Sequence, residues 1–205
     1  MRITWHLTIW QKLLLTVAIL GVAAGVGSLG TFATFTSSAA QSHTPATGTV
    51  IVALGATGAS TNRLNIGATD VAPGDTLQRS FDITNNGSLN LASITLTSTA
   101  SPSSLLDTDA TNGLQMNIDR CSVAWTESGP PYTYTCGGST SVVLASRAVI
   151  GATIALANLT STTAGVTDRL RLTLTLPGTA GNTFQNITST ISYSFTGTQR
   201  TATDK

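Results

Sequence analysis

The chain begins with a long apolar stretch and then changes to an alternation of aliphatic and hydroxyl-bearing residues. Residues 13–29 carry no charged side chain, and Arg2 and Lys12 precede them. A basic start, an apolar centre and an exit of small residues are typical of a secretory signal peptide. The stretch is 17 residues long, near the lower limit for a helix that spans a bilayer. The sequence therefore predicts export, with residues 1–34 as a cleaved signal peptide or, alternatively, an uncleaved anchor.

Beyond this segment, apolar residues recur at every second position, which is the pattern of half-buried β-strands. The clearest run is 168–177, where the alternating leucines are Leu170, Leu172, Leu174 and Leu176. A last strand is predicted at 186–196, which alternates Ile, Tyr and Phe with Ser and Thr. Similar patterns predict strands on both sides of residues 86–87, a weak strand at 63–70, and short strands at 50–54, 114–121, 142–144 and 154–156.

Three short motifs predict how these strands connect. Pro73-Gly74 favours a tight turn, because proline presets φ at the first central position and glycine accepts a positive φ at the second. Asn86-Gly87 is typical of a two-residue hairpin. The alternation changes phase at Ala92-Ser93, which predicts a β-bulge.

These elements predict an all-β domain. Eight to ten strands with no helix after the signal segment are expected of a β-sandwich or jelly-roll-like fold, in which two sheets bury their apolar faces against each other. We expect this domain over residues 49–200, preceded by a flexible segment at 35–48 and followed by a tail at 201–205.

Charge argues against nucleic acid as a partner. The chain has 10 basic and 9 acidic residues. Without residues 1–34 the net charge is −1, because Arg2 and Lys12 leave with that segment. Nucleic-acid binding requires clustered lysine and arginine. Membrane contact is expected only through the N-terminal segment before its cleavage.

Cys121 and Cys136 are the two cysteines of the chain. In an exported protein an even count predicts a disulfide, and free buried thiols are the alternative. The segment between them contains Trp125, Tyr132 and Tyr134 and reads as a stapled hairpin. Its aromatic side chains either form an exposed contact patch or pack against the sandwich, and packing is the favoured interpretation.

The chain has few of the side chains that commonly act in catalysis. After residue 34 the chain has one histidine, His43, and one glutamate, Glu127. A Ser-His-Asp triad or a zinc peptidase of the H-E-x-x-H type cannot be assembled from these residues. Asp107 and Asp109 form a D-x-D pair that could bind a cation, but an EF-hand needs more oxygen ligands, so a solvated loop is the favoured reading. The sequence predicts no cofactor and no enzyme activity.

Three stretches resemble the TasA/camelysin (CalY) family of bacterial proteins. They are GTFATF at 30–35, VAPGDTLQRSFDITNNGSLNLASITL at 71–96, and ISYSFTGTQR at 191–200. The resemblance implies a precursor cut by a SipW-type signal peptidase between Thr34 and Phe35. An alternative cut after Ala40 also fits the small-residue rule.

The same resemblance implies a secreted subunit of extracellular or biofilm-matrix fibres that self-associates by strand donation. The candidate donor is the segment 35–54, and its strand-like apolar residues are Val50, Ile51, Val52 and Leu54. The alternative function is a monomeric cell-surface binding or adhesion module, in which 50–54 pairs within its own domain. A camelysin-type metalloprotease is the third reading, and the sequence offers no ligand set for it.

Overall fold

The computed structural model describes residues 9–10, 49–65 and 71–202. The chain divides into two compact units, Met1–Pro45 and Ala46–Lys205. The predicted signal peptide, its cleavage between Thr34 and Phe35, and the segment 35–48 lie outside the described residues, apart from residues 9–10. Within the described ranges, no helix is long and apolar enough to cross a membrane.

The described part of the second unit is built from antiparallel strands. A five-stranded sheet has the order β1-β2-β9-β4-β7, a three-stranded sheet has the order β10-β3-β8, and β5 pairs with β6. The strands are β1 (Val52–Leu54), β2 (Thr76–Asn85), β3 (Leu91–Ala100), β4 (Gln115–Cys121), β5 (Trp125–Ser128), β6 (Thr133–Cys136), β7 (Thr140–Ala148), β8 (Gly151–Ala155), β9 (Thr167–Thr175) and β10 (Ile191–Gln199).

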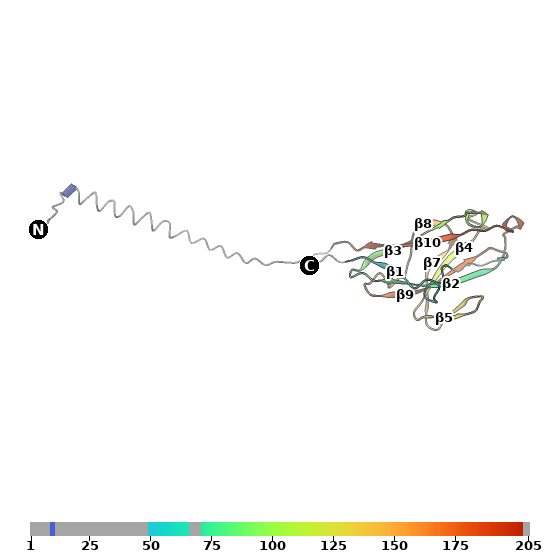
Figure 1. The fold of residues 1–205 in the computed structure, drawn as a ribbon, viewed down its shortest axis with the longest axis horizontal. Coiled ribbons are helices and arrows are strands. Elements are labelled where there is room, and N and C mark those ends of the chain that lie inside the picture. Colours follow the sequence, from blue (N-terminus) through green and yellow to red (C-terminus); the bar gives the residue numbers. More distant parts are fainter. Residues whose placement is uncertain (1–8, 11–48, 66–70, 203–205) are drawn as a thin grey trace. The chain divides into compact units, whose positions relative to one another are not determined.

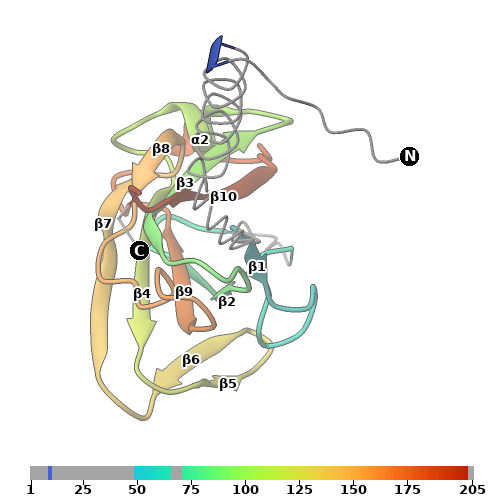
Figure 2. The ribbon, with the colours of Figure 1, turned by 90° about the vertical axis from the view of Figure 1, so that its left-hand side faces the viewer.

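The chain crosses repeatedly between the two larger sheets. Strand β2 lies in the five-stranded sheet, β3 in the three-stranded sheet and β4 in the five-stranded sheet again, and β7 to β10 alternate in the same way. Figures 1 and 2 show the two layers face to face, with the β5–β6 pair outside the larger sheet. The predicted all-β, jelly-roll-like sandwich is confirmed.

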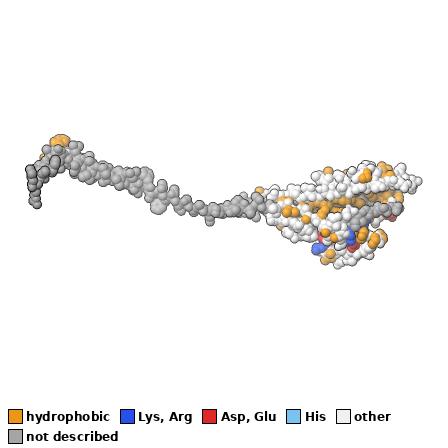
Figure 3. Space-filling model, viewed as in Figure 1, with side chains coloured by type: hydrophobic (Ala, Val, Ile, Leu, Met, Phe, Trp, Pro, Cys, Tyr) orange, Lys and Arg blue, Asp and Glu red, His pale blue; other side chains and the backbone are white. Residues whose placement is uncertain are grey.

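One apolar core lies between the two sheets. It combines Phe81 of β2, Leu170 of β9 and Met116 of β4 with Leu96 of β3, all fully buried. The rings of Phe81 and Phe195 lie 5.3 Å apart and join the layers. Figure 3 shows hydrophobic side chains along the seam between the layers and charged side chains gathered on the side of the β5–β6 pair.

Strand β9 confirms the alternation read from the sequence. Its leucines are buried in the core, whereas Arg169, Arg171 and Thr173 lie on the opposite, half-buried face. The strand occupies the centre of the larger sheet, between β2 and β4. A central strand with one covered face keeps a strict period of two, which explains why this element is so legible in the sequence.

The predicted turn at Pro73-Gly74 and the predicted bulge at Ala92-Ser93 are confirmed. Gly74 has φ of +94°, and the Asp75 amide donates to the Ala72 carbonyl at 2.9 Å, as a tight turn requires. In the β3–β10 ladder, Ser93 pairs with Thr198 and Leu91 with Gln199. Ala92 is thus the extra residue, at the predicted bulge.

The predicted hairpin at Asn86-Gly87 is wrong. Strands β2 and β3 lie in different sheets, so this connection crosses between layers instead of joining neighbours. The buried side chain of Asn85 organises it by donating to the Leu89 carbonyl at 3.0 Å and accepting from the Gly87 amide at 3.0 Å. A side-chain turn of this kind removes the need for a type I′ hairpin.

Other elements differ in extent from the sequence prediction. The last strand begins at Ile191, and residues 186–190 precede it without strand structure. Residues 63–65 are not a strand, and 66–70 lie outside the described residues. Two short helices, α2 (Leu105–Thr108) and η1 (Asn182–Phe184), correct the prediction of no helix after the signal segment, and α2 lies where a solvated loop was expected.

Candidate functional site

Strand β1 forms one edge of the five-stranded sheet and pairs antiparallel with the end of β2. Val52, Ala53 and Leu54 lie opposite Asn85, Thr84 and Ile83. The pairing continues before β1, where the carbonyls of Ile51 and Thr49 accept from the amides of residues 86 and 88 at 2.9 and 3.0 Å. Backbone bonds therefore hold residues 49–54 along the end of β2.

The side chains of this edge contribute less than its backbone. Val50, Ile51 and Leu54 are 37, 48 and 40% exposed. Val52 is half-buried and packs against the core. It does so over Gly197 of β10, where an added Cβ would lie 2.7 Å from the Val52 Cγ2 atom. One side chain thus anchors β1, and its three aliphatic neighbours are left partly in solvent.

The opposite edge of the same sheet is partly covered. Strand β7 forms that edge. The Ala157 amide donates to the Val143 carbonyl at 2.9 Å, and the Asn158 side-chain amide donates to the Val142 carbonyl at 2.8 Å. Covering an edge strand blocks pairing with other chains, so the two edges of this sheet differ in their capacity for association.

The β5–β6 hairpin lies on the outer face of the five-stranded sheet. The disulfide between Cys121 and Cys136 closes it, with Cα atoms 5.7 Å apart. The Trp125 indole donates to the Arg169 carbonyl at 3.1 Å, and the Tyr134 amide donates to the Gln78 side chain at 3.1 Å. The disulfide and the packing of the hairpin against the sandwich are confirmed.

One ion pair and two tyrosine side chains lie at the contact between the hairpin and the chain that follows β1. Arg63 donates to both carboxylate oxygens of Glu127, at 2.9 and 2.6 Å, and the Tyr134 hydroxyl donates to the same carboxylate at 2.9 Å. The Arg63 and Arg79 guanidinium groups lie 4.9 and 5.4 Å from the centre of the Tyr132 ring. We call these five residues the clasp.

The electrostatics of the clasp keep its carboxylate charged. The hydrogen bond from Arg63 lowers the pKa of Glu127, and the same bond raises the pKa of Arg63. Burial raises the pKa of Tyr134, which keeps its hydroxyl a donor. Beside the clasp, Arg171 bonds Asp119 at 2.9 Å and lies 4.5 Å from the Trp125 ring.

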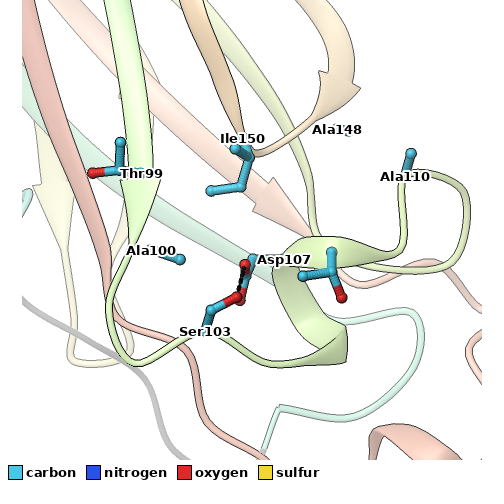
Figure 4. Close-up of a pocket in the computed structure, with 8 residues that line it drawn as sticks. Thr99, Ala100, Ser103, Asp107, Ala110, Ala148 and Ile150 are labelled. Carbon is cyan, nitrogen blue, oxygen red and sulfur yellow. Dashed lines mark hydrogen bonds between the residues drawn. The ribbon is translucent and has the colours of Figure 1, made fainter.

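The aspartates at 107 and 109 serve as caps. Asp107 and Ser103 line a shallow depression of about 530 Å³, and Figure 4 shows their side chains pointing toward each other. Its oxygens accept from the Ser103 hydroxyl at 2.6 Å, the Ser104 amide at 2.7 Å and the Ser189 hydroxyl. Asp109 accepts from the amides at 111 and 112, both at 2.9 Å. Each carboxylate is occupied by local donors, which accounts for both without a cation.

The described residues contain no group of three or more His, Cys, Asp or Glu side chains that could hold a metal ion. His6 and His43 lie outside those residues. Structural and catalytic zinc centres use three or four such ligands, so the donor set described here does not fit one.

Sequence reasoning found the hairpin and the edge strand but missed the clasp. Arg63 and Glu127 are 64 positions apart, and no periodicity connects them. Gly197 was also missed, since its role depends on the packing of Val52 across the sandwich.

Comparison with known proteins identifies the family. A search of curated proteins found no match. The family model described as camelysin metallo-endopeptidase matches residues 8–120, more than half of the 205 residues. The match covers β1 to β4 and ends one residue before Cys121, so the stapled hairpin and the strands after it lie beyond it. This chain belongs to the camelysin family.

Proposed function

We propose that the mature protein is an extracellular structural subunit that forms fibres by exchanging β1 between copies. The observation that carries this proposal is the character of β1: a three-residue strand at a sheet edge, held mainly by its backbone. Extended segments of this kind are transferred between chains in β-augmentation. The same bonds form on β2 whether β1 comes from its own copy or a neighbour, so exchange sacrifices little pairing.

Exchange through one edge gives an open assembly. Each copy passes β1 forward and receives the β1 of the copy behind it, and a head-to-tail contact that does not close produces a filament. The β7 edge supports this polarity, because Ala157 and Asn158 occupy two of its carbonyls, those of Val143 and Val142.

Electron microscopy of the purified mature protein tests the proposal. Hydrogen-bonded pairs alternate along an antiparallel ladder, which makes Ala53 a donor to Thr84. Ala53→Pro removes that donor and should abolish fibres. Ala202→Pro, at an exposed position after β10, is the matched control and should form fibres. Undiminished fibres from Ala53→Pro would contradict strand exchange.

A monomeric cell-surface binding module is the second candidate. It is favoured by one observation, that β1 pairs with β2 of the same chain. The two candidates separate by size-exclusion chromatography of the mature protein. A monomer that persists at high concentration and gives no fibres supports the binding module, whereas concentration-dependent growth supports the fibre subunit.

We propose no peptidase activity, although the family description names a metallo-endopeptidase. The absence of a fitting ligand group among the described residues supports this view. So does the single histidine, His43, that follows the predicted cleavage. Casein degradation measured with and without a chelator tests it, and chelator-sensitive hydrolysis would contradict it.

Export and processing complete the proposal. A SipW-type signal peptidase is expected to cut between Thr34 and Phe35, which releases the protein to the extracellular matrix or cell surface. N-terminal sequencing of the secreted protein should therefore begin at Phe35. A sequence that begins at Met1 would indicate an uncleaved anchor instead.

A further inference from the structure

The loop that follows β1 is hydrogen-bonded to β2. The amide of Arg63 donates to the Ser80 carbonyl at 2.8 Å, and the amide of Asp82 donates to the Thr61 carbonyl at 2.8 Å. The Ser80 hydroxyl adds a bond to the Ser60 carbonyl at 2.5 Å. This loop, residues 55–65, thus continues the edge of the sheet beyond β1.

The same loop is also folded upon itself. Asn62 is 7% exposed, and its side chain donates to the Gly55 carbonyl at 3.0 Å. The Gly58 amide donates to the Asn62 carbonyl at 2.8 Å. Gly55 is packed so closely that an added Cβ would lie 2.3 Å from the Thr61 carbonyl oxygen. The folded unit therefore begins at Gly55, directly after β1 ends.

The clasp joins this loop to the hairpin. Arg63 is the loop's contribution, and its side chain also donates to the Gly58 carbonyl. Glu127 and Tyr132 are the contributions of the hairpin, whose base the disulfide closes. Charge-assisted, two-pronged pairs are among the stronger hydrogen-bonded contacts in proteins. Residues 49–54, by contrast, contain no charged side chain and make no contact with the hairpin among the described bonds.

We infer that the clasp holds residues 55–65 against the stapled hairpin of their own subunit, so that the exchanged segment ends at or before Leu54. The partner in this assembly is a second copy of the chain. The part of the inference that concerns exchange between copies rests on the proposed function.

Hydrogen exchange on the unassembled mature protein tests the clasp without any fibre. The amides of residues 58–63 should exchange more slowly than those of residues 49–54. Glu127→Gln should accelerate exchange at 58–63 by roughly tenfold, the scale expected for loss of charge-assisted hydrogen bonds, and leave 49–54 unchanged. Asp119→Asn, which breaks the neighbouring ion pair with Arg171, is the control and should leave both segments unchanged.

Two results would overturn the clasp. One is equal exchange of the two segments in the native protein. The other is full protection of 58–63 in Glu127→Gln; the double variant Cys121→Ser, Cys136→Ser provides a second test of the same segment. The milder Glu127→Gln keeps the test decisive if the double variant does not fold.

Cross-linking in the assembled protein tests the boundary. In a mixture of Thr61→Cys and Asp82→Cys chains, a short thiol cross-linker should give no intermolecular product. A mixture of Ala53→Cys and Thr84→Cys chains should give one. An intermolecular product from the first mixture would overturn the boundary at Leu54. If the second mixture gives no intermolecular product, exchange of β1 is contradicted. The clasp is then tested only by hydrogen exchange of residues 58–63.

Discussion

Strand β1 and the β5–β6 hairpin are both additions to the five-stranded sheet, and they are held in opposite ways. The hairpin is closed by a disulfide and fixed by Glu127, Trp125 and Tyr134. β1 is held by backbone pairing and one anchoring side chain, Val52. Side-chain contacts require particular residues on both partners, so they fix the hairpin at one position. Backbone hydrogen bonds can form with any extended strand, so the position of β1 can also be filled by the same strand of another copy. For the proposed function, this difference favours β1 and not the hairpin as the exchanged element.

The largest expected effect comes from the core on which both segments depend. Phe81→Ala removes a fully buried ring that contacts Phe195 and should lower the free energy of unfolding by about 3–5 kcal/mol. Because β2 carries both β1 and the hairpin's contact at Gln78, both should be lost in one transition. Urea denaturation followed by hydrogen exchange measures this, and separate loss of the two segments would contradict a shared base.

Removal of the disulfide should separate the two segments. The double variant Cys121→Ser, Cys136→Ser opens a loop with a sequence separation of 15 and should cost about 3 kcal/mol. The hairpin should lose protection from hydrogen exchange while residues 49–54 keep theirs. Reductant added to the native protein should reproduce the result. Equal loosening of β1 would show that the hairpin supports it directly.

Removal of the side chain that anchors β1 should destabilise β1 and leave the hairpin unchanged. Val52→Ala removes a half-buried side chain from the core and should destabilise β1 by about 1 kcal/mol, with the hairpin unaffected. Val50→Ala is the matched control, because Val50 is exposed, and should change stability by less than about 0.5 kcal/mol. Thermal unfolding and hydrogen exchange provide the readings. Equal effects of the two substitutions would mean that Val52 is no anchor.

A fall in pH should weaken the attachment of the hairpin and leave the pairing of β1 unchanged. The bond from Arg63 lowers the pKa of Glu127, so its stabilising contribution is complete above the ordinary glutamate pKa of about 4.3. That contribution is lost as pH falls through the lowered pKa. The melting temperature of Glu127→Gln should therefore decline less on acidification than that of the native protein. Parallel declines would show that the Arg63–Glu127 pair contributes nothing to stability.

Local patterns in the sequence predicted the elements better than their partners. The leucines of β9, the Pro73-Gly74 turn and the bulge at Ala92 each follow from neighbouring residues. Asn86-Gly87 failed because turn chemistry does not reveal whether the next strand joins the same sheet or crosses to the other. The clasp depends on Arg63 meeting Glu127 across the fold, which no local pattern encodes.

Cross-linking between positions 53 and 84 tests the proposed exchange of β1 most directly. In β1, Ala53 lies opposite Thr84 of β2, so chains carrying Ala53→Cys or Thr84→Cys alone bring these two positions together only across subunits. A mixture of the two, treated with a short thiol cross-linker under assembly conditions, should give an intermolecular product. Thr173→Cys, on the same strand face of β9 as Arg171 but not opposite β1, should replace Thr84→Cys without giving product. Fibres that form with no product between positions 53 and 84 would contradict the exchange of β1.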